Sequence, residues 1–133
     1  MRRVAQRAFE SGDCGIACAA MLAGTSYEKA HEKALELGLR NSRGDYYSRF
    51  HQLQALLTEL GVRNHKQRRS PSWSAIEAPA ILKVNQAGKY WHWVVFSQYS
   101  NGKRYILDPE PGKTGHIHDF SNYVLSGNHI RIF

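Results

Sequence analysis

The hydrophobic periodicity of this chain changes once, at Gly61, and that change limits the folds open to it. Before Gly61, apolar residues recur at helical spacing in three segments. After it, short runs rich in Ile, Val, Leu and aromatic residues alternate with turn signals. A block of helices followed by a block of strands is typical of an α+β domain, in which helices pack on an antiparallel sheet. With 133 residues and 42% hydrophobic composition, the chain can bury one core, so we expect a single domain over residues 1–133.

Each helical segment carries its own start and stop signals. Asp13 is suited to cap the first helix, and Gly24 to end it. Thr25 and Glu28 form a capping-box pattern ahead of the second helix. The predicted helices cover Gly15–Ala23, Tyr27–Leu37 and Arg49–Leu60.

The second half of the chain predicts a sheet built around a hairpin. Asn101-Gly102 separates two apolar runs and is a strong hairpin signal. Phe120–Leu125 is interpreted as a helical turn. The predicted strands cover Ala80–Val84, Trp93–Gln98, Lys103–Leu107 and His129–Phe133.

The two cysteines, Cys14 and Cys18, lie one helical turn apart. Their Cβ vectors would be nearly parallel within a helix, which is poor geometry for a disulfide, so we expect two free thiols. Cys14 falls in the first turn, where unpaired N–H groups and the helix dipole favour a thiolate. Cys18 falls on the packed side and is expected to act as a small hydrophobic residue.

A thiolate nucleophile needs a base, and the base needs a group that orients it. His92 stands at the entrance of one predicted strand, and Asp108 stands at the exit of the next. Because the hairpin makes these strands antiparallel, His92 and Asp108 should meet at one edge of the sheet. This pattern predicts a Cys-His-Asp triad.

Three short motifs resemble those of the papain-like cysteine peptidases that process bacteriocins by cleaving after a double-glycine leader. They are Asp13 to Cys18, His92–Val95 and Leu107–Pro109. The resemblance implies a papain-like α+β fold and hydrolysis of a peptide or protein substrate without a cofactor. It assigns Cys14 as nucleophile, His92 as base and Asp108 as its orienting acid. It also assigns Gln6 as the oxyanion donor, although Gln6 precedes Cys14 by eight positions, more than is usual in that family.

Two other functions stay open. The same triad can perform deamidation, transglutamination or acyl transfer, as in papain-like toxin domains, and an immunity or inhibitor protein would then be a partner. The net charge of +7 and the run Arg63–Arg69 also fit a non-catalytic module that binds acidic peptide or RNA. In the simpler interpretation, Arg63–Arg69 is only a solvated basic loop.

Several remaining features have simpler interpretations. His116 and His118 could face a metal together, but with only two thiols in the chain we expect no metal site. Trp91 and Trp93 alternate with His92, so they should lie on the opposite face of the sheet and pack in the core. No apolar run approaches the roughly 18 residues of a membrane span, and no signal peptide is apparent. We therefore expect a cytoplasmic protein, or one delivered as part of a larger system.

Overall fold

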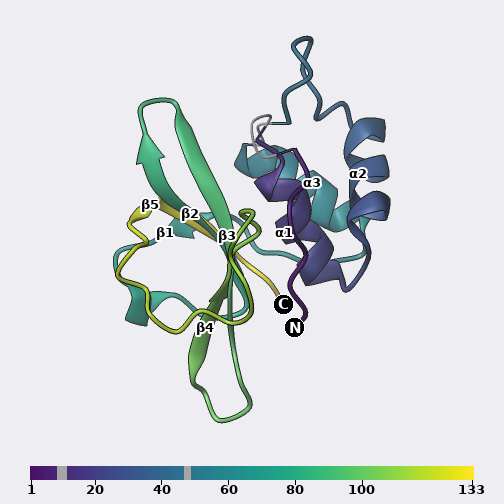
Figure 1. Ribbon diagram of the computed structural model, residues 1–133. Helices are drawn as coiled ribbons and strands as arrows, with labels where there is room; N and C mark the ends of the chain where they lie inside the picture. The colour runs from purple at the N-terminus through teal and green to yellow at the C-terminus, as the bar shows by residue number, and fades with distance from the viewer. Residues whose placement is uncertain (9–11, 47–48) are drawn as a thin grey trace.

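The computed structural model describes residues 1–8, 12–46 and 49–133, and over these ranges the helices precede the strands as the periodicity predicts. Three α-helices stand on one side of a sheet whose pairings are all antiparallel (Figure 1). The α+β class is therefore confirmed. The helices are α1 (Cys14–Ala23), α2 (Tyr27–Glu36) and α3 (Phe50–Glu59), with a short 3-10 helix, η2 (Trp73–Ala75). The strands are β1 (Arg68–Arg69), β2 (Ala80–Ala87), β3 (Tyr90–Gln98), β4 (Arg104–Leu107) and β5 (Leu125–Arg131).

Helix α1 is the centre of the helical layer. Every residue from Cys14 to Met21 is buried, and the helix contacts α2, α3 and β3. Its small side chains let these neighbours approach closely, because Ala, Gly and Cys add little bulk. The nucleophile candidate is thus anchored on the most enclosed helix in the described part of the chain.

One of the predicted caps is confirmed in position only, and another is wrong. Asp13 occupies the N-cap position of α1, but its side chain makes no capping hydrogen bond there. The cap of α2 is Ser26, whose hydroxyl accepts from the Lys29 N–H at 3.2 Å. Thr25 cannot serve because it completes the end of α1: its N–H bonds to the Ala20 carbonyl at 3.0 Å, beyond Gly24 in the left-handed conformation.

The strand order in the sheet is β1-β5-β2-β3-β4. The hairpin between β3 and β4 forms as predicted, with Gly102 at φ +87°. Phe120–Leu125 is not a helical turn: the Tyr123 N–H closes a turn on Phe120, and β5 begins at Leu125. The end of the basic run is also not loop, since Arg68–Arg69 pair with β5 as an edge strand.

The two faces of the sheet carry separate apolar clusters. The helix-facing cluster includes Ile81, Trp93 and Val95. The opposite cluster includes Val94 and Phe96, and η2 and the segment before β5 cover it. Trp93 packs edge-on against Phe50 with ring centroids 4.9 Å apart, so it lies on the opposite face from His92, as the alternation predicts.

Candidate active site

Cys14 is the first residue of α1 and lines a cleft between the helices and the sheet. The residue is 5% exposed, so only a small part of it reaches the cleft. The Cys14 N–H belongs to the first helical turn, whose donors have no acceptor within the helix. This position therefore combines a thiol with backbone donors that favour negative charge.

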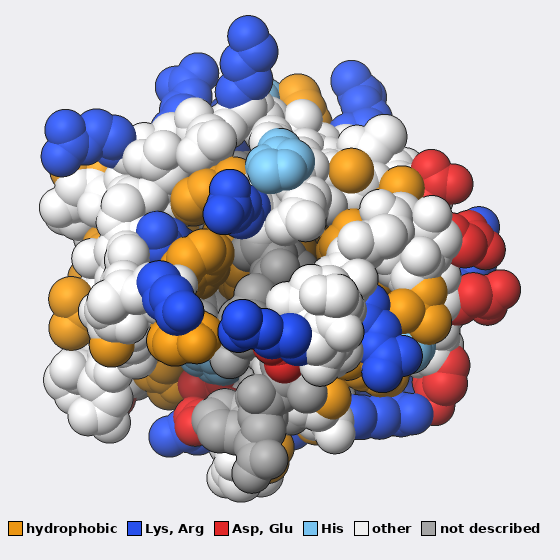
Figure 2. Space-filling model, turned by 90° about the horizontal axis from the view of Figure 1, so that it is seen from above, with side chains coloured by type: hydrophobic (Ala, Val, Ile, Leu, Met, Phe, Trp, Pro, Cys, Tyr) orange, Lys and Arg blue, Asp and Glu red, His pale blue; other side chains and the backbone are white. Residues whose placement is uncertain are grey.

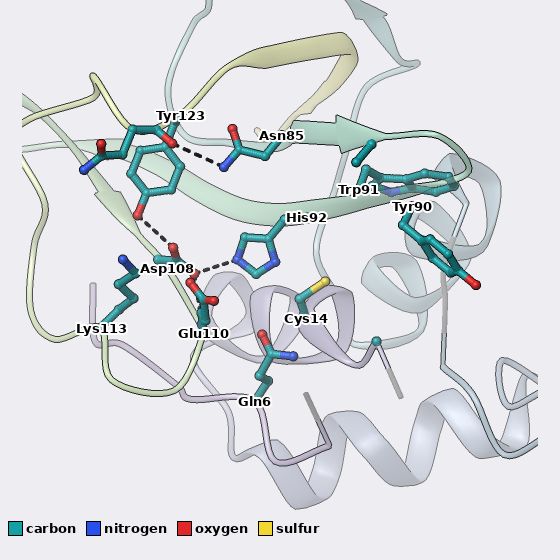
Figure 3. A pocket seen from close by; sticks show the side chains of 13 residues that line it. Gln6, Cys14, Asn85, Tyr90, Trp91, His92, Asp108, Glu110, Lys113 and Tyr123 are labelled. Carbon is teal, nitrogen blue, oxygen red and sulfur yellow. Dashed lines mark hydrogen bonds and ion pairs between the residues drawn. The ribbon is translucent and has the colours of Figure 1, made fainter. Parts of the chain in front are cut away.

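His92 and Asp108 meet at the sheet edge as the hairpin predicts. The His92 Nε2–H donates to Oδ1 of Asp108 at 2.6 Å. The ring lies between Asp108 and Cys14, and its other nitrogen faces the sulfur (Figure 3). The structure thus brings together the three residues that the sequence predicts to form a triad.

The electrostatics of this group favour a charged imidazole. Burial alone lowers the pKa of His92, but hydrogen bonds and charge from Asp108 and Cys14 outweigh it and raise the pKa to about 10. Burial likewise raises the pKa of Asp108, yet the hydrogen bond and charge of His92 hold it below its usual value. An imidazolium held between Asp108 and Cys14 can protonate a leaving group.

Tyr123 completes the binding of Asp108 and was not identified from the sequence. Its hydroxyl donates to Oδ2 of Asp108 at 2.7 Å. The loop that carries Tyr123 is held by Asn85, which sits at a bulge of β2 with φ +53° and donates its N–H to the Val124 carbonyl at 2.8 Å. The Asn85 Oδ1 also accepts from the Val124 N–H at 2.7 Å. Tyr123 reaches the site through a long-range contact, so the sequence around it does not indicate its role. Asn85, a polar residue at the end of a predicted strand, is the local feature that could have pointed to this loop.

Gln6 lies in the same cleft, so the structure brings it to Cys14 despite the long spacing. Its backbone N–H bonds to the Pro109 carbonyl at 2.9 Å, which ties its segment to the turn that carries Asp108. Arg3 strengthens this tie by donating to the carbonyls of Asp108 and Glu110, each at 2.7 Å. The Gln6 Nε2 donates to Oδ1 of Asp13 at 2.9 Å.

The cleft has a volume of about 460 Å³. Trp91 lines it together with Tyr90, so Trp91 is not only a core residue as the sequence suggested. Glu110 and Lys113 lie at the end near Asp108.

Seen from the end that carries the β2–β3 hairpin, the molecule shows many Lys and Arg side chains, while Asp and Glu gather mainly on the side of α2 (Figure 2). A basic face suits substrates with acidic groups.

Cys18 and the histidine pair have no part in this cleft. The Cys18 thiol is fully buried and donates to the Trp93 carbonyl at 3.4 Å, and burial raises its pKa. Both cysteines are free thiols, as expected. His116 and His118 both bond to the Tyr99 hydroxyl, at 2.7 and 3.0 Å.

Within residues 1–8, 12–46 and 49–133, one group has metal-ligand spacing: His92, Asp108 and Glu110, with donor atoms within 4.8 Å of one another. Two of its members, His92 and Asp108, already bind each other. No helix in the same ranges is both long enough and apolar enough to cross a bilayer.

The comparisons with known proteins agree with this geometry. Among solved structures, the chain is similar to a double-glycine motif protease from an AMS/PCAT transporter, determined in complex with its leader peptide. The TM-score is 0.63 at 22% identity, and the alignment covers 98% of this chain and 93% of that one. This likeness supports the papain-like α+β fold. No curated protein matches. Residues 3–122 match the Peptidase C39 family. Because the match spans most of the sequence, the chain belongs to the Peptidase C39 family and is a cysteine protease.

Proposed function

We propose that Cys14, His92 and Asp108 form the catalytic triad, and that the chain cleaves a peptide after a double-glycine leader. The observation that carries this proposal is the placement of His92 between the Asp108 carboxylate and the Cys14 thiol at the base of the cleft. The leader peptide bound to the similar transporter protease supports the choice of substrate. We also propose that residues 1–133 act as one domain.

The proposed reaction has two halves, acylation of Cys14 and hydrolysis of the resulting thioester. The Cys14 Sγ attacks the scissile carbonyl carbon, and the Cys14 N–H and Gln6 Nε2 donate to the oxyanion that forms. The imidazolium of His92 then gives its proton to the leaving amine, and a thioester remains on Cys14. Neutral His92 next takes a proton from water, the hydroxide attacks the thioester, and the acid product leaves with Cys14 restored. Asp108 keeps the ring oriented throughout.

The test is cleavage of a synthetic peptide with a double-glycine leader, followed by mass spectrometry. Wild-type protein should produce two fragments that meet at the double glycine. Cys14→Ala should abolish both fragments, whereas Cys18→Ala, which alters the buried thiol one turn away, should keep them. Cleavage by Cys14→Ala would refute the assignment.

The same assay separates hydrolysis from the other reactions of a papain-like triad. Release of ammonia without chain cleavage would identify a deamidase, and a crosslinked or acylated product would identify a transferase. Either result, dependent on Cys14, would support a toxin domain that acts with an immunity protein. Products cut at the double glycine contradict that alternative.

A further inference from the structure

We propose that Asp13 is a positioning residue for catalysis: its carboxylate fixes the Gln6 side-chain amide so that Nε2 can donate to the oxyanion. The inference rests on the oxyanion role proposed for Gln6. It gives a function to the carboxylate beside the nucleophile, since Asp13 occupies the N-cap position but makes no capping hydrogen bond there.

The Asp13 side chain is fully buried and collects hydrogen bonds from outside α1. Among the described residues, one donor reaches Oδ1 and three reach Oδ2. Oδ1 accepts from the Gln6 Nε2 at 2.9 Å. Oδ2 accepts from the Arg7 N–H at 2.8 Å, the Ala8 N–H at 2.9 Å and the Tyr27 hydroxyl at 2.6 Å. The carboxylate of Asp13, which directly precedes Cys14, therefore joins the Gln6 segment to α2.

The chemistry of these contacts selects one orientation of the amide. An ionised carboxylate only accepts hydrogen bonds, so Nε2 of Gln6 must face Asp13, and a flipped amide would place Oε1 against Oδ1. The Gln6 Oε1 is buried and has no partner among the described residues, so no contact of Oε1 selects the orientation. Asp13 is therefore the group that prevents a flip.

This orientation leaves a donor free for substrate. Nε2 carries two hydrogens, and Oδ1 of Asp13 takes one of them. Gln6 is 5% exposed as a residue and lines the same cleft as Cys14. The second hydrogen can serve an oxyanion on a carbonyl attacked by Cys14 only while the amide keeps this orientation.

Asp13→Asn tests the inference with little change of shape. Three donors compete for the single side-chain oxygen that this variant keeps, so that oxygen should take the place of Oδ2 and the new NH₂ should face Gln6. The Gln6 amide should then flip and withdraw its donor. We expect kcat for leader-peptide cleavage to fall roughly 10²-fold with KM unchanged, as for loss of an oxyanion donor. Iodoacetamide should still alkylate Cys14 at the wild-type rate, because alkylation forms no oxyanion.

A double-mutant cycle shows whether Asp13 acts through Gln6. Gln6→Leu alone should lower kcat by about 10²–10³-fold. Adding Asp13→Asn to Gln6→Leu should then change kcat little, because the amide is already gone. Asp119→Asn makes the same charge change on an exposed loop and should leave kcat unchanged. Additive effects of the two variants, or an unchanged kcat in Asp13→Asn, would overturn the inference.

Nuclear magnetic resonance of the wild-type protein gives a test that no variant's folding can obscure. The Gln6 side-chain NH₂ should show one proton that exchanges slowly with solvent and one that exchanges fast. Two equally fast protons would overturn the inference. If the wild-type protein cleaves no leader peptide, the proposed substrate fails while this measurement still decides the Asp13–Gln6 contact. If Gln6→Leu keeps full kcat, Asp13 has no oxyanion donor to position, and the inference fails while the triad stands.

Discussion

The Tyr123 hydroxyl donates a 2.7 Å hydrogen bond to Oδ2 of Asp108, the carboxylate oxygen that His92 does not use. Oδ1 meanwhile accepts from both His92 and the Glu110 N–H, the latter at 2.9 Å. Both oxygens of a carboxylate that is 1% exposed are thus bound within the protein, which fixes the plane of the carboxylate and with it the imidazole.

Tyr123→Phe should therefore reduce both stability and activity. A hydrogen bond to a buried charge contributes about 1.5–3 kcal/mol, and its loss leaves Oδ2 without a donor. We expect the free energy of unfolding in urea to fall by that amount and kcat to fall as the carboxylate loosens. Tyr105→Phe removes a hydroxyl from another buried tyrosine that packs against His116 and should change both quantities less. Equal effects of the two variants would count against a special role for Tyr123.

The pKa of His92 should depend measurably on Asp108. The pKa of about 10 exceeds the ordinary value of 6.5, so folding favours the protonated ring. That stabilisation is complete below about pH 6.5 and is lost as the pH rises through about 10. The hydrogen bond to Asp108 is the largest contribution that raises the pKa, and the Asp108 charge adds to it. Asp108→Asn removes the charge and weakens the hydrogen bond, so it should lower the pKa of His92. A titration of the His92 ring protons by nuclear magnetic resonance measures the pKa directly. Equal pKa values in the wild-type protein and in Asp108→Asn would refute the assignment of the shift to Asp108.

The two thiols should differ strongly in reactivity. Cys14 lines the cleft beside His92, whereas Cys18 is fully buried and has a raised pKa. Near neutral pH, iodoacetamide should alkylate Cys14 much faster than Cys18, because the thiolate is the reactive form. Peptide mass mapping over a time course gives both rates. Comparable sluggishness of the two cysteines would contradict an activated nucleophile.

The basic run permits a test of the non-catalytic alternative. Arg68 and Arg69 form the edge strand β1, separated from the catalytic strand β3 by β5 and β2. Exposed charges act over about 8 Å at physiological salt, so Arg68→Glu with Arg69→Glu should leave kcat/KM for leader peptide unchanged. A large rise in KM would place part of the substrate on this edge. Salt-dependent RNA binding that is lost in this variant and indifferent to Cys14→Ala would instead favour the binding module.

The sequence predicted those parts of the site that depend on local patterns. Cys14 is placed by a helix start, and His92 and Asp108 are placed by the two ends of a hairpin, so short motifs suffice to bring them together. Tyr123 and Asp13 were assigned to a helical turn and a helix cap because local sequence was the only guide. The Tyr123 hydroxyl bonds to Asp108, 15 residues away. Asp13 accepts from Gln6, seven residues before it, and from Tyr27, 14 residues after it, so both sets of contacts depend on how the chain folds back. Polar side chains in loops follow tertiary contacts that no periodicity records.

The cap of α2 shows the same limit in energetic terms and can be measured. Thr25 matched a capping box in the sequence, but its N–H is used by the end of α1, so Ser26 supplies the capping oxygen. Losing a Ser cap costs about 1 kcal/mol. Ser26→Ala should lower the free energy of unfolding by that amount, while Thr25→Ala should change it much less, because its contribution to α1 comes from the backbone. Urea denaturation of both variants separates the two assignments: a larger loss in Thr25→Ala would restore the capping box that the sequence suggested.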